Sequence, residues 1–398
     1  MYTSKIRWVI LLLLFIATGL SFLDRQVLSI VIIKIQKEFN FSDVEYGFIN
    51  TFFLVGYAIM FTVSGRIIDV VGSKLGLAVS VGLWSIANCF HGVINNYNQL
   101  VVARFSLGVG EGGCFPGAAK TVNEWFDSKR RAFANGIAIG GSAIGAVIAP
   151  PLTIYLSNAY GWRWAFMIPG FVGIVWVLVW VMLPKNKVGE AIKLENPAAK
   201  IPFLSFFRNR DALVFIAIRF MLDPVIYFLM FWVPKYLNQE RNVSFERIGQ
   251  LFWVPFLALG ISNIIGGWLS DKLISNNFTV NRARKIVMGI AATMTLSMPF
   301  IATVSTPERA VALMALFMFA HGFWITNYIT SISDVFGDKG TATVVGLSGT
   351  AGATSSLIIN PMIGVVVQNY TYAPLWVIAG FLYPLAFILF VVTIKIKK

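Results

Sequence analysis

Cysteine is almost absent from this sequence, which has 2 cysteines in 398 residues. Cys89 and Cys114 each lie inside an apolar segment, and their spacing fits neither a metal site nor a disulfide framework. We therefore expect no disulfide scaffold and no metal site, and we expect both thiols to be small buried side chains.

Charged residues are also scarce. They make up 13% of the chain, against about 25% in an ordinary soluble domain, whereas 57% of the residues are hydrophobic and the mean hydropathy is +0.74. Apolar runs of the roughly 20 residues that cross a bilayer recur from Trp8 to the end. The sequence therefore predicts an all-α integral membrane protein with little room for a soluble domain.

Motifs for catalysis are missing as well. The chain has no Walker loop and no Ser/His/Asp arrangement. Gly108, Gly110, Gly112 and Gly113 lie within an apolar helical segment with no preceding strand, so they predict close helix contact rather than phosphate binding. The net charge of +14 comes from short loops between apolar runs and not from one basic face. We expect no enzymatic activity, no cofactor and no nucleic-acid partner.

Twelve membrane-spanning helices are predicted from the apolar runs. Their ranges are 7–36, 44–71, 75–95, 98–120, 130–158, 162–184, 211–238, 244–270, 284–304, 308–332, 339–368 and 372–395. The first run lacks the small-residue cleavage site of a signal peptide and continues through Asp24 and Arg25. We expect it to be retained as the first span.

The distribution of Lys and Arg predicts the orientation of these helices. An even number of spans places both termini on one side, and positively charged loops stay in the cytoplasm. One alternate set of loops holds most of the basic residues, Arg284 and Lys285 among them. The opposite set holds only Lys34, Lys37, Arg163, Lys235, Arg241, Arg247 and Arg309. Both termini are therefore predicted to be cytoplasmic.

A polar stretch and an internal repeat divide the chain into halves. Residues 185–210 form the longest polar stretch and predict a cytoplasmic linker between two six-helix bundles, residues 1–184 and 211–398. The segment G-R-I-I-D at 65–69 matches G-W-L-S-D at 267–271. Such duplicated bundles bind substrate near the membrane midplane, between the halves, and rock one half against the other.

The segment from Gly65 to Lys74 resembles the G-x-x-x-D-x-x-G-x-R/K signature of the major facilitator superfamily, and it lies between the second and third predicted spans. Glycine permits a tight turn and close helix contact, and an acid at a helix end can hold basic groups of a neighbour. We assign Gly65, Asp69, Gly72 and Lys74 to gating. The second copy contributes Asp271 but lacks the later glycine, so we expect a weaker latch there.

A more specific resemblance runs along nearly the whole chain, to the anion:cation symporter family and, within it, most closely to the hexuronate transporter branch. It rests on residues 23–28 (LDRQVL), 103–105 (ARF) with 110–111 (GE), 124–126 (EWF), 161–166 (GWRWAF), 223–224 (DP) and 320–324 (AHGFW) with Asn327 and Asp334. The resemblance implies proton-driven uptake of glucuronate, galacturonate or a related acid in the bacterial inner membrane. In the fifth span, relatives carry an amide side chain in a glycine-rich turn where this chain has Ser142. That difference leaves the exact sugar acid open.

Four ionisable residues fall at membrane depth, where a charge costs at least about 2.5–3.5 kcal/mol. Asp24 and Arg25 lie in the first span, and Arg104 and Glu111 lie two helical turns apart on one face of the fourth. All four are expected to face the bundle interior. Arginine can grip a carboxylate through two parallel hydrogen bonds, so we choose Arg25 first and Arg104 second for the substrate.

Asp24 and Glu111 are the predicted proton carriers, because a buried carboxyl group can bind and release a proton where an arginine cannot. The family resemblance also implies coupling roles at these matched positions. Two alternatives stay open. The four charges could only neutralise one another as a packing network, or Arg25 could pair with Asp24 or Glu111 while another cation binds substrate.

Uncharged polar and aromatic side chains complete the predicted substrate site. These candidates are Tyr46, Ser142, Tyr227, Trp324, Asn327, Ser355, Ser356 and Asn360. Aromatic faces with polar tips suit a hydroxylated ring, but core packing is the competing interpretation for each. Arg219 is a further cation, and Pro224 after Asp223 is expected to break its span. His321 is either a proton relay or a packed side chain.

The sequence predicts a secondary transporter that imports a sugar-acid anion with protons, and a monomer suffices for this mechanism. Another organic anion, such as galactonate, glucarate or an aromatic acid, is the alternative substrate. A drug:proton antiporter on the same fold is a second alternative, against which two cavity-facing arginines argue. A membrane-embedded enzyme or sensor lacks the catalytic constellation or signalling domain that it would need.

Overall fold

The computed structural model describes residues 4–126, 128–184 and 203–396. Within these ranges, the side chains of residues 4–5, 62, 65–66, 69, 123, 128–133, 203–205, 338–340 and 342 are not described. Every regular element of the described residues is helical, which confirms the all-α prediction. The chain divides into two compact units, Met1–Pro197 and Ala198–Lys398.

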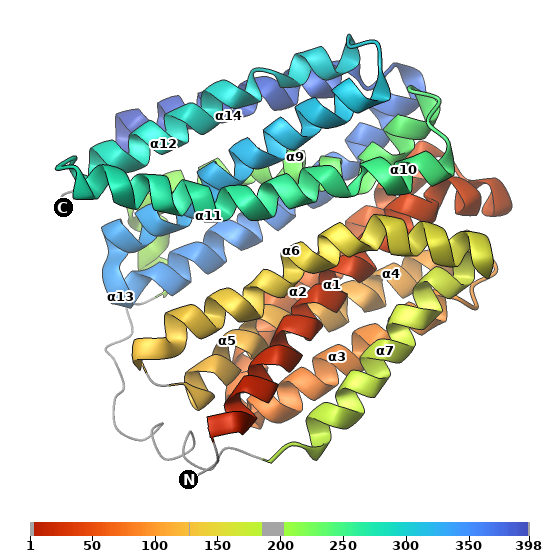
Figure 1. The fold of residues 1–398 in the computed structure, drawn as a ribbon, viewed down its shortest axis with the longest axis horizontal. Coiled ribbons are helices and arrows are strands. Elements are labelled where there is room, and N and C mark those ends of the chain that lie inside the picture. The colour runs from red at the N-terminus through yellow and green to blue at the C-terminus, as the bar shows by residue number, and fades with distance from the viewer. Residues whose placement is uncertain (1–3, 127, 185–202, 397–398) are drawn as a thin grey trace. The chain divides into compact units, whose positions relative to one another are not determined.

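The first unit is a bundle of seven described helices. They are α1 (Ser4–Phe39), α2 (Asp43–Val71), α3 (Ser73–His91), α4 (Tyr97–Glu111), α5 (Cys114–Trp125), α6 (Ser128–Ala159) and α7 (Trp162–Met182). Helix α1 packs along α6, α2 packs along α4, and α3 packs against both α4 and α7 (Figure 1). These contacts bring α1 and α4, the carriers of the predicted charges, into one bundle.

The second unit is built around a long bent helix. Its described elements are η1 (Phe203–Arg208), α9 (Arg210–Gln239), α10 (Phe245–Leu251), α11 (Trp253–Ser275), α12 (Val280–Thr295), η2 (Met298–Ala302), α13 (Pro307–Asn369) and α14 (Ala373–Thr393). Helix α13 packs against α9, α11 and α12, and α14 packs against α9 and α12. At Gly337, where φ is 58°, α13 leaves helical geometry. The bend separates two apolar stretches, which correspond to the predicted spans 308–332 and 339–368.

Eleven helical segments of the described residues are long and apolar enough to cross a membrane. The predicted span 98–120 is not among them, because α4 ends at Glu111 and α5 begins at Cys114. Glu111 therefore stands at the end of a helix and not in the middle of one. The first predicted span is one continuous helix, α1. The number of twelve spans and the cytoplasmic termini stay predictions.

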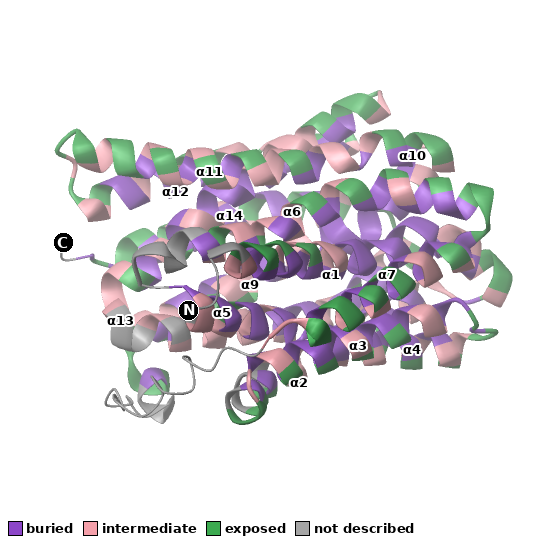
Figure 2. Ribbon diagram, turned by 60° about the horizontal axis from the view of Figure 1, so that its bottom comes forward, coloured by how far each residue is buried: buried purple, intermediate pink, exposed green. Residues whose placement is uncertain are grey.

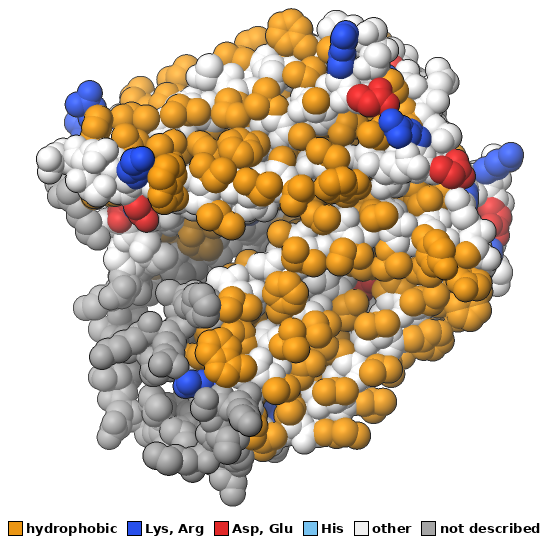
Figure 3. Space-filling view, in the orientation of Figure 1, with side chains coloured by type: hydrophobic (Ala, Val, Ile, Leu, Met, Phe, Trp, Pro, Cys, Tyr) orange, Lys and Arg blue, Asp and Glu red, His pale blue; other side chains and the backbone are white. Residues whose placement is uncertain are grey.

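The distribution of burial is that of a membrane protein. Large apolar side chains are exposed, among them Met182 (82%), Ile264 (76%) and Val392 (69%), whereas Arg104 and Glu111 are fully buried. Buried residues run along the helices between exposed ones (Figure 2). In Figure 3, apolar side chains cover most of the visible face, and most of the visible Lys, Arg, Asp and Glu lie toward its margins. A lipid environment accounts for this arrangement, because hydrocarbon solvates apolar side chains and not charges.

Glycines set the closest helix contacts of the first unit. A Cβ atom at Gly108 in α4 would lie 2.1 Å from the Phe53 carbonyl oxygen of α2, and one at Gly141 in α6 would lie 1.9 Å from the Phe15 carbonyl oxygen of α1. Side chains at these positions would force the helices apart. The helix-contact interpretation of the fourth-span glycines is thus confirmed. The glycine run around Ser142 is helical and not a turn.

The expected break at Pro224 is wrong. Helix α9 continues through both Pro224 and Pro234. A proline removes one backbone donor, but neighbouring groups in a membrane bundle can satisfy the carbonyl that it frees. The tight turn predicted at Gly72 is present, since this residue joins α2 to α3 with a φ of 89°.

Candidate functional site

The four predicted membrane charges lie buried together in the first unit. Asp24 and Arg25 come from α1, Arg104 and Glu111 come from α4, and each is at most 3% exposed. Arg25 and Glu111 are 86 residues apart in sequence, so the packing of α1 and α4 within one bundle, and not local spacing, makes the cluster. We call these four residues the charge cluster.

Arg25 and Glu111 form a direct ion pair. The Arg25 Nε donates to Glu111 Oε2 at 2.5 Å, and the Ser21 hydroxyl donates to the same oxygen at 3.1 Å. The guanidinium carbon of Arg25 also lies 4.4 Å from the centroid of the Tyr57 ring, within cation–π range. The alternative in which Arg25 pairs with Glu111 is therefore the arrangement that the structure contains.

Asp24 is held by an amide. The Asn88 Nδ2 of α3 donates to Asp24 Oδ1 at 2.8 Å, and Asp24 Oδ2 has no hydrogen-bond partner among the described residues. The charge of Arg104 acts on this carboxylate. Asn88 was not predicted as a site residue. The signal available in the sequence was a polar amide within an apolar span, but only ionisable residues were considered as members of a buried cluster.

Arg104 is the most unusual member of the charge cluster. Its side chain is fully buried, and none of its three guanidinium nitrogens has a hydrogen-bond partner among the described residues. The guanidinium carbon lies 4.7 Å from the centroid of the Phe53 ring. A buried charged group without hydrogen bonds is costly, and an anion with two oxygen atoms would satisfy these donors.

Two further buried polar residues of the first unit, Asn50 and His91, were missed from sequence, whereas Tyr46 was predicted. The Nε2 atom of His91 lacks a partner within the described part of the chain. The charge of Arg104 acts on His91 and on Tyr46, and Tyr46 is itself fully buried. The surroundings of Arg104 are thus polar, although the segments that form them are apolar overall.

Of four uncharged candidates of the second unit, Asn327 and Asn360 bond to other helices, and Ser355 and Ser356 bond within α13. Asn327 donates to the Gly266 carbonyl at 3.2 Å, and Asn360 accepts from the Trp232 indole at 3.0 Å. The Ser355 and Ser356 hydroxyls both donate to the Gly352 carbonyl, at 2.9 and 2.7 Å. These bonds agree with the competing interpretation of packing for all four residues.

The other predicted aromatic and hydroxyl groups lie in different settings. Ser142 donates to the Ile139 carbonyl of its own helix at 2.7 Å. Trp324 is buried with an unpartnered indole nitrogen, within the described residues, and lies edge-on to Tyr383 at 5.5 Å. Tyr227 is partly exposed and lies 5.6 Å from the Phe231 ring.

A second, partly buried ion pair lies in α9. The Arg219 Nη2 atom is 2.7 Å from Asp223 Oδ2, and the Asp223 carboxylate lies against Gly352 of α13 so closely that a Cβ there would be 2.0 Å from it. In α13 itself, His321 shares a 2.7 Å hydrogen bond with the Tyr383 hydroxyl, as expected for a packed side chain.

The predicted gating residues are described in part. Lys74 donates to the Val181 carbonyl at 2.7 Å and to that of Leu183, so it binds the C-terminal end of α7. The surroundings of Gly65 and the side chain of Asp69 are not described. In the second copy, Asp271 is 3.7 Å from Arg284.

Arg284 was assigned to a basic loop from sequence, and this assignment is wrong. It lies in α12, is only 7% exposed, and is bonded to Asp334 at 3.2 Å and to the Ser270 hydroxyl at 2.6 Å. Charge counting along the sequence treated it as a cytoplasmic cation. The structure uses it to join α11, α12 and α13.

Within the described residues, no group of three or more His, Cys, Asp or Glu side chains could hold a metal ion. The buried ionisable residues of the first unit gather in the charge cluster, beside amides and aromatic rings. Two fixed cations and two titratable acids in a buried, polar setting suit the binding of an anion and of protons.

Comparison with known proteins places the chain in a family. Residues 14–361 match the family model of the Major Facilitator Superfamily. The chain belongs to this superfamily. It is a multi-pass membrane transporter and not an enzyme. The match confirms the resemblance drawn from the segment Gly65 to Lys74.

Relatives within the superfamily are named as transporters of sugar acids. The hexuronate transporter of Bacillus subtilis is 30% identical over 389 residues, covering 95% of this chain and 92% of that protein. The hexuronate transporter of Escherichia coli K12 is 28% identical over 391 residues, covering 94% and 90%. A D-galactonate transporter of Escherichia coli O6:H1 is 26% identical over 401 residues, covering 92% and 91%. These relatives confirm the resemblance to the hexuronate transporter branch.

Solved structures share the superfamily fold. A D-xylose-proton symporter aligns with a TM-score of 0.80 at 15% identity, covering 98% of each chain. A bacterial homologue of the human lysosomal transporter Spinster, in an inward-facing and unoccupied conformation, aligns with a TM-score of 0.75 at 20% identity, covering 98% of this chain and 96% of the other.

Proposed function

We propose that this transporter imports a hexuronate such as glucuronate or galacturonate together with protons, by alternating access across the bacterial inner membrane. The names of the relatives support the substrate class, and the charge cluster supports the coupling. In this proposal both termini are cytoplasmic, residues 185–210 link the bundles 1–184 and 211–398, and a monomer carries out transport.

One observation carries the proposal: Arg25 is bonded to Glu111, while the nearby Arg104 has no hydrogen-bond partner among the described residues. Arg25 cannot give its Nε–H to a substrate carboxylate and to Glu111 at once. Protonation of Glu111 removes its negative charge and weakens the pair, which releases Arg25 for the substrate. Proton binding and anion binding then favour each other, and linkage makes the coupling reciprocal.

The remaining residues of the charge cluster take complementary roles. Arg104 supplies a second cation for the substrate carboxylate. Asp24, with one carboxylate oxygen unpartnered among the described residues, supplies a second proton site. Tyr46, Tyr227 and Trp324 would contact the sugar ring and Ser142 would bind a hydroxyl, whereas the bonds of Asn327, Ser355, Ser356 and Asn360 favour packing over the substrate role expected from sequence. Gly65, Asp69, Gly72, Lys74 and Asp271 would control opening.

The decisive experiment is uptake of radiolabelled glucuronate and galacturonate by the purified protein in proteoliposomes, with and without an inward proton gradient. We expect uptake that depends on the gradient and that is lost in Arg25→Ala. Arg163→Ala is the matched control. Arg163 forms a half-exposed ion pair with Glu38 and is not a member of the charge cluster. Folded protein that transports neither sugar would refute the hexuronate assignment.

A second candidate substrate is an aldonate or aldarate, since a relative of similar coverage is named a D-galactonate transporter. Unlabelled galactonate and glucarate added to the same vesicles distinguish the two. A hexuronate transporter keeps its labelled uptake at concentrations of galactonate that would saturate a galactonate transporter.

A further inference from the structure

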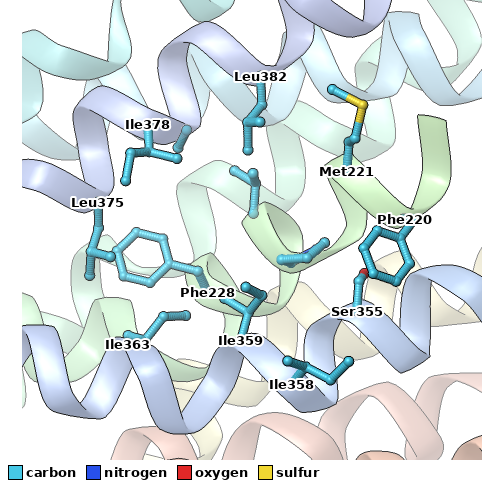
Figure 4. A pocket seen from close by; sticks show the side chains of 13 residues that line it. Phe220, Met221, Phe228, Ser355, Ile358, Ile359, Ile363, Leu375, Ile378 and Leu382 are labelled. Carbon is cyan, nitrogen blue, oxygen red and sulfur yellow. The ribbon is translucent and has the colours of Figure 1, made fainter. Parts of the chain in front are cut away.

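An apolar groove lies in the second unit between α9, α13 and α14. Figure 4 shows its walls, with Phe220 and Phe228 from α9, Ile358 from α13, and Ile378 and Leu382 from α14. Its volume is about 390 Å³, within the range of about 300–1,000 Å³ that is typical of ligand pockets. The groove lies wholly within this unit and is separate from the charge cluster, which belongs to the first.

The rim of the groove is exposed and apolar. Phe220 is 46% exposed, Ile358 is 50% exposed and Ile378 is 57% exposed, although all three are large and apolar. Their helices are among the segments long and apolar enough to cross a membrane. Hydrocarbon is the medium that suits exposed apolar side chains on helices of this kind.

The lining determines what can fill the groove. Ser355 is the one polar side chain among its lining residues, and its hydroxyl already donates to the Gly352 carbonyl at 2.9 Å. A sugar acid would lose its hydration there without gaining hydrogen bonds. Apolar cavities also stay free of water and take up apolar molecules. Ser355, predicted above as a substrate residue, thus lies on an apolar wall.

We propose that this groove binds one acyl chain of a membrane phospholipid, with the headgroup outside the groove. The groove lies next to the contact between α9 and α13 at which the Asp223 carboxylate packs. Pro224 on its wall follows Asp223, whose carboxylate packs against Gly352, and Ser355 follows Gly352 by less than one helical turn. An acyl chain in the groove supports the contact of α9 with α13 from the lipid side. This inference does not depend on which substrate is carried.

The proposal is tested by photo-cross-linking on the full-length protein in phosphatidylethanolamine and phosphatidylglycerol vesicles. The probe is a phospholipid with a diazirine in the middle of one acyl chain, and adducts are mapped by peptide mass spectrometry. We expect adducts enriched on residues 220–228, 355–363 and 375–382. A phospholipid with its diazirine on the headgroup should not give this enrichment, because the headgroup lies outside the groove; a free fatty acid with a diazirine is the third probe.

Two variants fill the groove from one wall. Ala379→Trp and Leu382→Trp should each lower the groove adducts several-fold. Val377→Trp is the matched control, since Val377 is 44% exposed on the same helix and does not line the groove; its adducts should match those of the wild type. Monodisperse elution shows that each variant is folded.

Adducts spread evenly over the exposed apolar faces of the helices would overturn the proposal, as would groove adducts that survive both tryptophan substitutions. Enrichment with the fatty-acid probe alone would also overturn it, because the occupant would then not be a phospholipid. If neither variant folds, the wild-type adduct map with the three probes still decides.

Discussion

At the scale of single residues, the asymmetry between two arginines is the main feature of the candidate site. Arg25 is bonded to Glu111, whereas Arg104 has a ring beneath it and no hydrogen-bond partner among the described residues. Removing one member of a buried ion pair commonly costs about 3–5 kcal/mol, and an apolar replacement of the whole pair can cost nothing. A chain that keeps such charges buried at membrane depth keeps them at an energetic cost, which is most simply explained by function.

The coupling role of Glu111 is tested by Glu111→Gln. Glutamine cannot lose a proton, so Arg25 should be available for the substrate at every pH. We expect proton-driven uptake to be abolished, counterflow exchange to persist, and substrate affinity to become independent of pH. Gradient-driven uptake and counterflow in proteoliposomes measure the two activities separately.

The matched control for Glu111→Gln is Glu38→Gln, which removes a half-exposed acid paired with Arg163 at 2.7 Å. This variant should retain both activities, since it lies outside the charge cluster. Loss of both activities in Glu111→Gln, in folded protein, would argue against a dedicated coupling role.

The buried Arg284 should contribute to stability rather than to substrate binding. Arg284→Met leaves Asp334, which is 16% exposed, without its cation. We expect a loss of about 3 kcal/mol, near the lower end for one-sided removal of a buried pair. Asp271→Asn removes a partner that is 76% exposed, and it should cost less than about 1 kcal/mol. Chemical unfolding of the purified variants checks both values, and equal losses would contradict this ranking.

At the scale of elements, the helices meet where glycine removes a side chain, and they end or bend where glycine relaxes the backbone. Gly108 and Gly141 set helix approach, whereas Gly72 and Gly337 adopt a positive φ at a turn and a bend. The end of α4 just before Gly112 places the Glu111 carboxylate at a helix terminus. The local backbone thus contributes to the position of the predicted proton carrier.

Two glycines of α6 give a paired test of helix contact. Gly141→Ala would place a Cβ 1.9 Å from the Phe15 carbonyl oxygen, whereas Gly140 has no neighbouring atom within 4 Å of such a Cβ. We expect Gly141→Ala to cost about 1–3 kcal/mol, and Gly140→Ala to be neutral or to stabilise the helix by less than about 1 kcal/mol. Thermal unfolding in detergent should show a lower midpoint for Gly141→Ala alone. A similar drop in both variants would mean that α1 and α6 are not in this close contact.

At the scale of the whole molecule, the orientation in the membrane follows from the loops. The basic loops predict cytoplasmic termini, and the family membership does not test this. A fluorescent protein fused after Lys398 should fluoresce in the cytoplasm, and alkaline phosphatase fused there should be inactive. Alkaline phosphatase fused after Tyr160, in the loop before α7, should be active. The opposite pattern would reverse the topology and the direction of transport that we propose.

Much of the architecture could be predicted from sequence, because hydropathy and the cost of buried charge are properties of short segments. The boundaries of α1 and α14 lie within a few residues of the predicted spans 7–36 and 372–395. The interruption between α4 and α5 was missed, since both halves are apolar and the two glycines also fit a continuous helix. The break expected at Pro224 was wrong, since the bundle around α9 tolerates the proline.

The sequence by itself determined that the chain crosses a membrane, that it is helical, and which four charges must be buried in the first unit. Only the tertiary structure decided that Arg25, and not Arg104, bonds to Glu111, that Asn88 holds Asp24, and that Arg284 is buried. The physical reason is that a partner is chosen by distances of about 3 Å between atoms on separate helices. Hydropathy along one segment indicates which residues lie at membrane depth, but the packing of several helices fixes which side chains are buried and what they touch.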